Sequence, residues 1–417
     1  MGAVTGVRVG IEKLRAYPGS LALAMPVLCE ARGRDANEIR DTMMVDERSL
    51  NVPWEDPVTM AVNAALPMLS ERDRAEIGLL IVASESGVDQ EKPMSTWVQR
   101  YLGLSSRVRN IEVKHACYGA TAGVQLAASW VASGVAPGET ALVINTDQSR
   151  MHFGRPWEYV LGAAAVAVLV SARPRVVELE LGACGIHTNE VSDLTRPTPH
   201  VETGNSETSL LSYLDGLEGA FDDYVRRRPD AADLERYFQR LVYHLPFAGM
   251  GLVAHRALLR RAGRSLGRAD ANAHFARTCG ASLAHARRMG GTYGASTFLA
   301  LMSLIDHDTA LATGDRVGVF SYGSGSCAEL WTGRVLPEAR EVVRAAGLPA
   351  LLDRRRQVTV AEYEAVELAR AQAIDAGDHT TDRTLLGDWY ERYYTAAPHL
   401  VFDGTAEHYR RYSWSVS

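Results

Sequence analysis

The sequence lacks several features that define large classes of protein. Its 417 residues carry a net charge of −6, so it has no excess of the basic residues with which nucleic-acid-binding proteins displace counterions. It also lacks an apolar run of the roughly 20 residues that cross a bilayer, and its N-terminus has no signal-peptide pattern. We therefore expect a cytoplasmic protein that binds neither nucleic acid nor membranes.

Cysteine pairs and lysines are also scarce. The five cysteines are scattered along the chain: Cys29, Cys117, Cys184, Cys279 and Cys327. Their number is odd and they have no Cys-x-x-Cys spacing, so we expect neither a disulfide framework nor a metal site. Lysine occurs only at Lys13, Lys92 and Lys114, among abundant arginines, which we interpret as a coding bias.

Apolar patterns predict an α/β fold. Continuous apolar runs of strand length predict central strands, buried on both faces, at residues 76–83, 139–144 and 161–170. A short alternating run predicts a strand at residues 7–11. Helical spacing of apolar residues predicts helices at residues 35–43, 57–69, 210–224, 232–243 and 254–268.

Cys117 stands at the joint between a strand and a helix. An apolar run ends at Val113, a helix-forming run starts near Tyr118, and the residues around Cys117 are small. The positive end of a helix dipole lowers the pKa of a nearby thiol, and small neighbours leave room for an acyl group. Cys117 is therefore either a nucleophile that carries an acyl thioester or a buried structural cysteine.

Two other residues have the chemistry of an acid or a base. Glu85 directly follows the apolar run 76–83, at the end of a strand where α/β proteins place their active sites. It is either a general base or a loop carboxylate that accepts bonds from nearby amides. His244 precedes Leu245-Pro246-Phe247 and is either a catalytic group or a hydrogen-bonded structural histidine.

The chain contains an internal duplication. Residues 117–121 (CYGAT) precede an Ala-rich helix, an Ala-Pro-Gly-Glu turn and the strand run ALVINTD. Residues 292–296 (TYGAS) precede a similar helix, an Ala-Thr-Gly-Asp turn and the run RVGVFSYG. The repeat predicts two pseudo-symmetric α/β halves, with the nucleophile kept only in the first copy. The alternative is a chance likeness of two Ala- and Gly-rich helices.

Together these motifs resemble the 3-hydroxy-3-methylglutaryl-CoA (HMG-CoA) synthase family of the thiolase fold, from near Val9 to about Ser326 and more loosely to the C-terminus. The matching stretches are Glu85 to Asp89, Ala116 to Tyr118, Asp193 with Arg196-Pro197, His244 to Phe247 with Met250, and Ser321 to Ser326. The resemblance implies a five-layered αβαβα architecture of two halves, at residues 1–171 and 172–417.

The resemblance also assigns roles. Cys117 would accept an acetyl group, Glu85 would remove a proton from its methyl, and His244 would donate a hydrogen bond or proton to the ketone that the enolate attacks. The pocket and oxyanion hole would include Tyr118, Asp193, Gly291, Gly325 and Ser326, with backbone N–H groups of Cys117 and of the loop 323–326 as donors. No cofactor and no metal are implied, since the substrates are carried as phosphopantetheine or CoA thioesters.

Four positions depart from the family pattern. His115 stands where the family has Glu, and Gly291 stands where it has Asn. The lysines that meet the CoA phosphates correspond to Gly249 and Val253. These losses point away from free CoA and towards the polyketide β-branching synthases, which act on acyl carrier proteins.

The resulting hypothesis is a homodimeric synthase of antibiotic-type polyketide biosynthesis. It would take acetyl from an acetyl-acyl carrier protein and add it to the β-ketone of a carrier-bound acceptor, giving a 3-hydroxy-3-carboxymethyl branch. Acidic carriers would dock on a basic helix through Arg256, Arg260, Arg261 and Arg264, unless that helix is only a solvated face. The alternatives are a mevalonate-pathway HMG-CoA synthase, an initiation-type ketoacyl synthase and a non-enzymatic scaffold.

Overall fold

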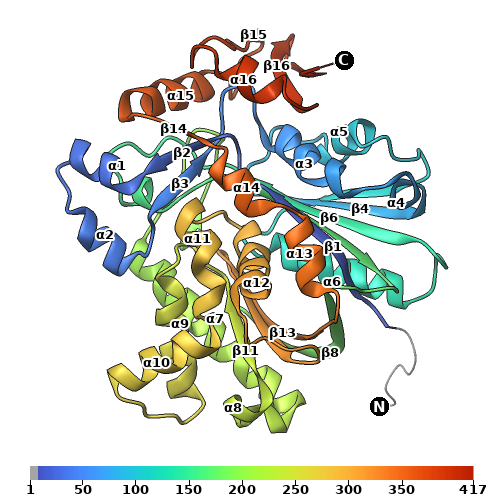
Figure 1. Ribbon diagram of the computed structural model, residues 1–417, viewed down its shortest axis with the longest axis vertical. Coiled ribbons are helices and arrows are strands. Elements are labelled where there is room, and N and C mark those ends of the chain that lie inside the picture. The colour runs from blue at the N-terminus through green and yellow to red at the C-terminus, as the bar shows by residue number, and fades with distance from the viewer. Residues whose placement is uncertain (1–7, 417) are drawn as a thin grey trace.

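The computed structural model describes residues 8–416. Its centre is a nine-stranded mixed sheet with the order β11-β12-β13-β8-β1-β7-β6-β4-β5 (Figure 1). The strands are β1 (Gly10–Tyr17), β4 (Ile77–Ala83), β5 (Arg109–Val113), β6 (Thr140–Asp147), β7 (Ala164–Ser171), β8 (Val177–Thr188), β11 (Arg240–Tyr243), β12 (Arg316–Gly323) and β13 (Cys327–Val335).

This sheet consists of two halves with the same topology. The order β1-β7-β6-β4 of the first half recurs as β8-β13-β12-β11 in the second. In each half the first two neighbouring pairs are antiparallel and the last pair, β6 with β4 or β12 with β11, is parallel. The halves join through a short antiparallel contact between β1 and β8. The duplication predicted from sequence is therefore confirmed.

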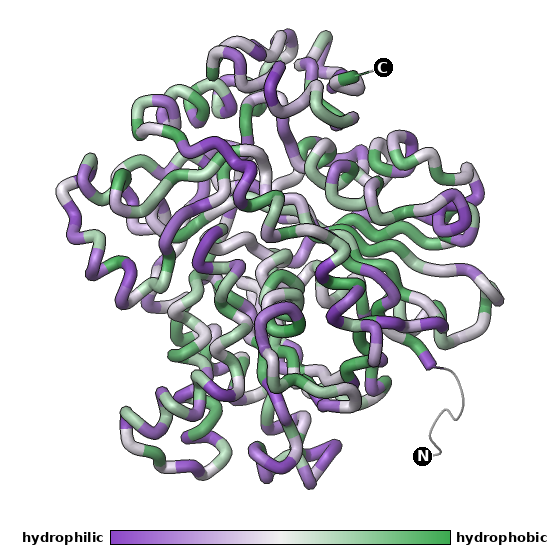
Figure 2. Tube along the Cα trace, in the orientation of Figure 1, coloured by the Kyte–Doolittle hydropathy of each residue, from purple (hydrophilic) through white to green (hydrophobic). Residues whose placement is uncertain are grey.

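The buried side chains on the two faces of the sheet show that the fold has five layers. In β4 and β6, Ile81 and Val143 pack with α6 (Gly119–Ala132), whereas Leu80 and Leu142 face α3 (Pro57–Ala65) on the other side. Such strands must be apolar on both faces, which explains their continuous apolar runs. Figure 2 shows hydrophobic residues concentrated in the strands of the central sheet and hydrophilic residues in loops and short helices at the periphery.

The middle layer contains α6 and α12 (Ala295–His307), the two helices of the duplicated motif. Thr121 of α6 hydrogen bonds Ser321 of β12, and α12 contacts strands of both halves. The outer layers are α3 with α5 (Met94–Tyr101) on the first half, and α7 (Ser206–Arg227) with α9 (Met250–Arg261) on the second. The expected thiolase-like αβαβα architecture is thus confirmed.

The C-terminal segment returns to the first half of the chain. Tyr394 and Tyr17 both donate hydrogen bonds to the buried carboxyl of Glu55. Figure 1 shows this segment at the top, above β2. The surrounding elements are α1 (Met25–Ala31), α2 (Ala36–Thr42), β2 (Leu21–Ala24), β3 (Glu47–Leu50), β14 (Arg356–Gln357), α15 (Val360–Gln372), β15 (His379–Thr380), α16 (Trp389–Tyr394), β16 (Leu400–Ala406) and β17 (Tyr409–Trp414). The boundary at residue 171 stays a prediction.

The remaining elements are short. They are α4 (Glu71–Glu76), β9 (Leu194–Thr195), β10 (Thr203–Gly204), α8 (Leu234–Tyr237), α10 (Arg268–Thr278), α11 (Ala284–Met289), α13 (Ala339–Ala345), α14 (Leu348–Asp353) and four single 3-10 turns at residues 66–68, 156–159, 229–232 and 280–283. Within residues 8–416, no helix is both long and apolar enough to span a bilayer.

Three expected elements differ from the structure. Residues 232–243 are not one helix: α8 is a single turn, and β11 follows because its apolar residues pair in parallel with β12. Residues 254–268 are not one helix either, because α9 ends at Arg261 and Gly263 takes a left-handed conformation (φ +73°) that ends helices. The strand expected at 7–11 runs from Gly10 to Tyr17, and residue 7 lies outside the described residues.

Candidate active site

The carboxyl ends of β4 and β6 bring two acidic residues together. Because these strands are parallel neighbours, the loop after β4 lies beside the end of β6. Asp147, the last residue of β6, accepts hydrogen bonds from the Glu85 backbone N–H (2.9 Å) and from the hydroxyls of Ser84 and Ser86 (3.1 and 2.8 Å). Asp147 therefore fixes the loop that carries Glu85.

The Cys117 thiol lies directly against Glu85. Its Sγ donates a hydrogen bond to Glu85 Oε1 at 3.1 Å. Cys117 occupies a tight turn before α6, in which Ala116 has a positive φ of 40° that is rare for a residue with a side chain. On the other side, the backbone of Gly323 packs so closely that a Cβ there would come within 2.6 Å of the Tyr118 nitrogen.

Burial sets the protonation states of this pair. Burial, reinforced by Asp147 and opposed by the Arg196 guanidinium, raises the pKa of Glu85 from 4.5 to about 8. Burial and the Glu85 carboxyl raise the pKa of Cys117 well above its ordinary value. This direction is opposite to the one we predicted from the helix dipole. The thiol is therefore protonated and serves as the hydrogen-bond donor to Glu85.

His244 directly follows β11, the counterpart of β4 in the second half. It is 1 % exposed, its Nδ1 lies 2.8 Å from Ser296 Oγ, and its carbonyl accepts a hydrogen bond from the Tyr213 hydroxyl. Burial lowers the pKa of His244 to about 3, so the ring is neutral. The start of α12 packs against both residues. Ser296 contacts the His244 ring, and Gly294 lies so close to Cys117 that a Cβ at Gly294 would be 2.9 Å from the Cys117 carbonyl oxygen.

Two of the predicted pocket residues, Asp193 and Tyr118, hydrogen bond to neighbouring side chains and backbone. Asp193 is buried and accepts hydrogen bonds from the Gly325 N–H and the Tyr322 hydroxyl, both at 3.0 Å. It therefore holds the loop 323–326 in place. The Tyr118 hydroxyl donates to the buried Glu329 at 2.7 Å, and burial raises the pKa of Glu329 to about 7.

The expected oxyanion donors need a correction. The N–H of Gly325 is bonded to Asp193, and the N–H of Ser326 is bonded to the Asn189 carbonyl at 2.6 Å. These two groups are not free donors. Among the described residues, the Cys117 N–H has no recorded acceptor and stays available.

Gly291 lies where a side chain could not fit. A Cβ at this position would come within 1.9 Å of the Pro246 carbonyl oxygen, and the Gly291 N–H is bonded to the Val160 carbonyl. The backbone therefore has no room for the Asn that the family resemblance implies at this position. His115, the other departure near the nucleophile, lines the cavity, and burial lowers its pKa.

A cavity of about 1010 Å³ opens onto Glu85 and the turn of Cys117. Its walls include Arg196, which donates to the Glu85 carbonyl and pairs with Glu202 at 2.7 Å. They also include Arg150, whose buried Nε has no partner among the described residues. The sequence does not single out Asp147, Arg150 or Glu202 in advance. Asp147 could have been found, because it lies at the end of a buried strand, just as Glu85 lies directly after one.

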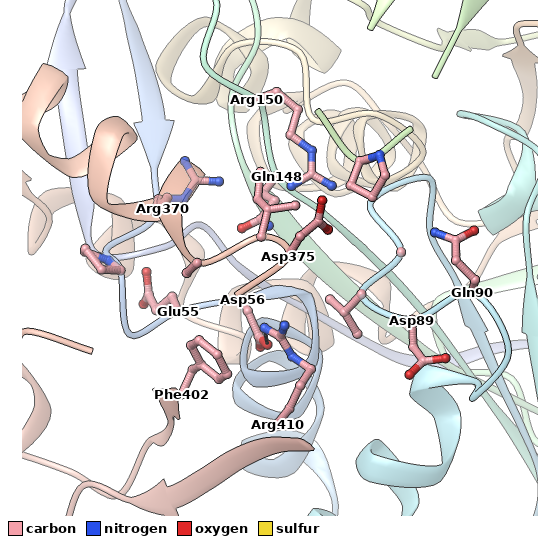
Figure 3. Close-up of a pocket in the computed structure, with 16 residues that line it drawn as sticks. Glu55, Asp56, Asp89, Gln90, Gln148, Arg150, Arg370, Asp375, Phe402 and Arg410 are labelled. Atoms are coloured by element: carbon pink, nitrogen blue, oxygen red, sulfur yellow. Dashed lines mark hydrogen bonds and ion pairs between the residues drawn. The ribbon is translucent and has the colours of Figure 1, made fainter. Parts of the chain in front are cut away.

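A smaller cavity of about 150 Å³ adjoins the first. Arg150 lines both, and Figure 3 shows its guanidinium directed into the smaller one, above Asp375 and beside Gln148. Burial and the neighbouring Arg196 lower the pKa of Arg150 to about 10, which leaves it charged at neutral pH. Arg150 can therefore donate hydrogen bonds to an anion or carbonyl that enters from the larger cavity.

The four predicted docking arginines differ in their surroundings. Arg261 pairs with Asp222 and Arg264 with Glu235, and Arg256 donates to Asn272. Arg260 has no ion pair among the described residues. A surface hollow of about 240 Å³ lies between α9 and α10 and is lined by Arg256, Leu259, Arg260, Arg264, Leu266, Arg268 and Ala271.

One group of side chains has metal-ligating chemistry. His285, Asp306 and His307 place their ligand atoms within 4.8 Å of one another. The Asp306 carboxylate already pairs with Arg344 at 2.8 Å, and Arg288 adds a second positive charge near His285. We assign no metal to this group.

Comparison with known proteins agrees with this geometry. Residues 55–174 match the model of the hydroxymethylglutaryl-coenzyme A synthase N terminal family, and residues 252–390 match the C terminal one. The chain is 40 % identical over 371 residues to the polyketide biosynthesis 3-hydroxy-3-methylglutaryl-ACP synthase PksG of Bacillus subtilis, covering 86 % of this chain and 87 % of that protein. It is 33 % identical to the hydroxymethylglutaryl-CoA synthase of Enterococcus faecalis, covering 86 % and 91 %.

A solved structure extends the likeness to the whole fold. The HMG synthase of the curacin biosynthetic pathway matches with a TM-score of 0.92 and 38 % identity, covering 98 % of this chain and all of that one. Glu85, Cys117 and His244 thus lie on a scaffold that this chain shares with the curacin synthase. The chain belongs to the hydroxymethylglutaryl-CoA synthase family of enzymes.

Proposed function

We propose that this enzyme condenses an acetyl group with the β-ketone of a polyketide chain held on an acyl carrier protein. The observation that carries the proposal is the 3.1 Å contact between the Cys117 thiol and Glu85 beside a large cavity. The likeness to PksG, a 3-hydroxy-3-methylglutaryl-ACP synthase, supports carrier protein over CoA. So do the curacin synthase structures that contain an acetyl donor carrier protein.

The first step loads the nucleophile. Cys117 sulfur attacks the donor thioester, its proton passes to Glu85, and Glu85 then passes that proton to the departing phosphopantetheine sulfur. Acetylation replaces the thiol hydrogen that donated a hydrogen bond to Glu85. The carboxylate then loses its hydrogen-bond donor and faces the acetyl methyl, which makes it a stronger base.

The second step forms the carbon–carbon bond. Glu85 takes a proton from the acetyl methyl, and the enolate carbon attacks the acceptor ketone. The resulting alkoxide accepts a hydrogen bond from His244 and receives the proton that Glu85 took from the methyl, which returns Glu85 to the carboxylate. Water finally cleaves the thioester to Cys117 and leaves a carboxymethyl branch. In this scheme the Cys117 N–H stabilises the enolate oxygen.

Donor competition tests this function. Intact-mass measurement of Cys117 acetylation should show acetyl-carrier protein outpacing acetyl-CoA by at least tenfold. Equal or better use of acetyl-CoA together with acetoacetyl-CoA would favour the mevalonate-pathway alternative. Consumption of malonyl-carrier protein with release of CO2 would favour the ketoacyl synthase alternative, and no acetylation by any thioester would favour a scaffold.

The hollow between α9 and α10 is our proposed carrier docking surface. Arg260 and Arg268 line it without ion pairs among residues 8–416, so they can meet acidic carrier residues. The variant Arg260→Glu/Arg268→Glu should raise KM for acetyl-carrier protein by about tenfold at low salt, with kcat little changed. Arg392→Glu, on the exposed surface of α16, is the matched control. An unchanged KM would remove this surface from the scheme.

We further propose a homodimer in the cytoplasm. The edge strand β5 leaves backbone groups unpaired on its outer side and exposes Ile111, which suits pairing with a second copy. All five cysteines are free thiols in the structure, as in a reducing compartment. Light scattering at micromolar concentration tests the dimer.

A further inference from the structure

The duplicated motif places a hydroxyl at its fifth position in both copies. In the first copy, Thr121 donates to the Ser321 hydroxyl at 2.9 Å in a buried contact between the halves. In the second copy, Ser296 contacts the His244 ring at 2.8 Å. The second copy lost the nucleophile but kept a hydroxyl that touches the active-site histidine.

Counting hydrogens assigns the direction of this bond. Ser296 Oγ already accepts the Leu245 N–H at 3.1 Å. Its own hydrogen has one recorded acceptor among the described residues, His244 Nδ1. The hydroxyl therefore donates to Nδ1, and a neutral ring whose Nδ1 accepts must carry its proton on Nε2.

The backbone of His244 is fixed independently. Its N–H donates to the Phe320 carbonyl at 2.7 Å, and its carbonyl accepts from Tyr213. These bonds hold the residue but do not choose between the two tautomers or between the two ring orientations. Within residues 8–416, the Ser296 contact is the one hydrogen bond to a ring nitrogen of His244.

We propose that Ser296 is a positioning residue that fixes His244 as the Nε2–H tautomer, with this N–H as the hydrogen-bond donor to the acceptor ketone. This rests on the proposed function. In this arrangement the ring remains neutral while the alkoxide forms, so His244 acts as a hydrogen-bond donor and not as an imidazolium acid. In this scheme Ser296 acts on the His244 ring and not on the substrate.

The test compares loss of the hydroxyl in the two copies. Ser296→Ala should lower the kcat of condensation by about 10- to 100-fold and leave Cys117 acetylation by intact mass within about twofold, since loading does not use His244. Ser296→Thr keeps the hydroxyl and should recover most of the rate. Thr121→Val, the matched change in the first copy, should leave condensation within about threefold.

A second readout does not depend on catalysis. In the ¹⁵N-histidine NMR spectrum, the His244 signals, assigned with His244→Gln, should report an Nε2–H ring in wild type and mixed tautomers in Ser296→Ala. An Nδ1–H ring in wild type, or full condensation by folded Ser296→Ala, would overturn the proposal. If wild type loads acetyl but never condenses, the proposed function fails while the NMR result still decides the tautomer. Should Ser296→Ala not fold, the wild-type spectrum and Ser296→Thr decide.

Discussion

The two halves of the molecule place different pairs of side chains on the same framework. In the first half, the loop after β4 and the turn before α6 place a carboxyl against a thiol, Glu85 against Cys117. In the second half, the end of β11 and the start of α12 place an imidazole against a hydroxyl, His244 against Ser296. In the proposed mechanism, the first unit makes the carbon nucleophile and the second polarises the carbonyl that it attacks. The following predictions test this division.

The largest effect should come from the first position of the duplicated motif. Cys117→Ala removes the atom that carries the acetyl group, so condensation should fall on the order of 10⁴-fold or more. Thr292→Ala, at the equivalent position, should keep the rate within about tenfold, because the buried Thr292 hydroxyl has no partner among the described residues. Steady-state turnover with intact-mass detection measures both. A severe loss in Thr292→Ala would mean that both copies take part in the chemistry.

A smaller but selective loss should follow from Glu85→Gln. The amide cannot accept the methyl proton, so condensation should fall about 10²- to 10⁴-fold. Acetylation should slow far less, since the thiol proton that Glu85 accepts during loading is much more acidic than the methyl proton. Single-turnover assays separate the steps. Equal losses in loading and condensation would contradict the role of Glu85 as the base for the methyl.

The pH dependence should follow the raised pKa of Glu85. Because only the ionised carboxylate can act as the base, kcat/KM for condensation should rise with pH, about tenfold per unit, and level off near pH 8. The neutral His244 adds no opposing limb in this range. A profile already flat from pH 6 would show that Glu85 ionises at its ordinary pKa.

Stability should change with pH in the opposite direction. Protonated Glu85 is favoured by the fold, so its contribution is present below pH 4.5 and is lost as pH rises towards 8. Glu85→Gln should therefore gain stability relative to wild type between pH 5 and 8, measured by denaturant unfolding. A constant difference across this range would contradict the raised pKa.

The smallest effect should come from the first-copy hydroxyl. Thr121→Val removes one partner of the buried contact with Ser321 and should lower the free energy of unfolding by about 1–2 kcal/mol. A double-mutant cycle with Ser321→Ala isolates the interaction. No coupling between the two positions would indicate that the halves are held together by apolar packing alone.

Much of this fold could be predicted from local sequence patterns. β4, β6 and β7 are buried on both faces, so their apolar runs were unmistakable, and the strand–helix joint at Cys117 was located correctly. β11 was mistaken for the end of a helix because four residues give no clear period, and its strand character comes from pairing with β12.

The partners of the catalytic groups were harder to predict. Glu85 meets Asp147 across 62 positions of sequence, and His244 meets Ser296 across 52. Such contacts arise from parallel strands and the crossing of α12, which no local pattern encodes. The sequence could point to Ser296 only through the duplication, which aligns it with Thr121.

The tight approach of Gly291 to Pro246 constrains how this chain can change over time. Any residue larger than glycine at position 291 would drive its Cβ into a main-chain oxygen. Such a substitution therefore requires an earlier shift of the Pro246 segment. The order of the two changes, and not only their sum, decides which sequences this fold can reach.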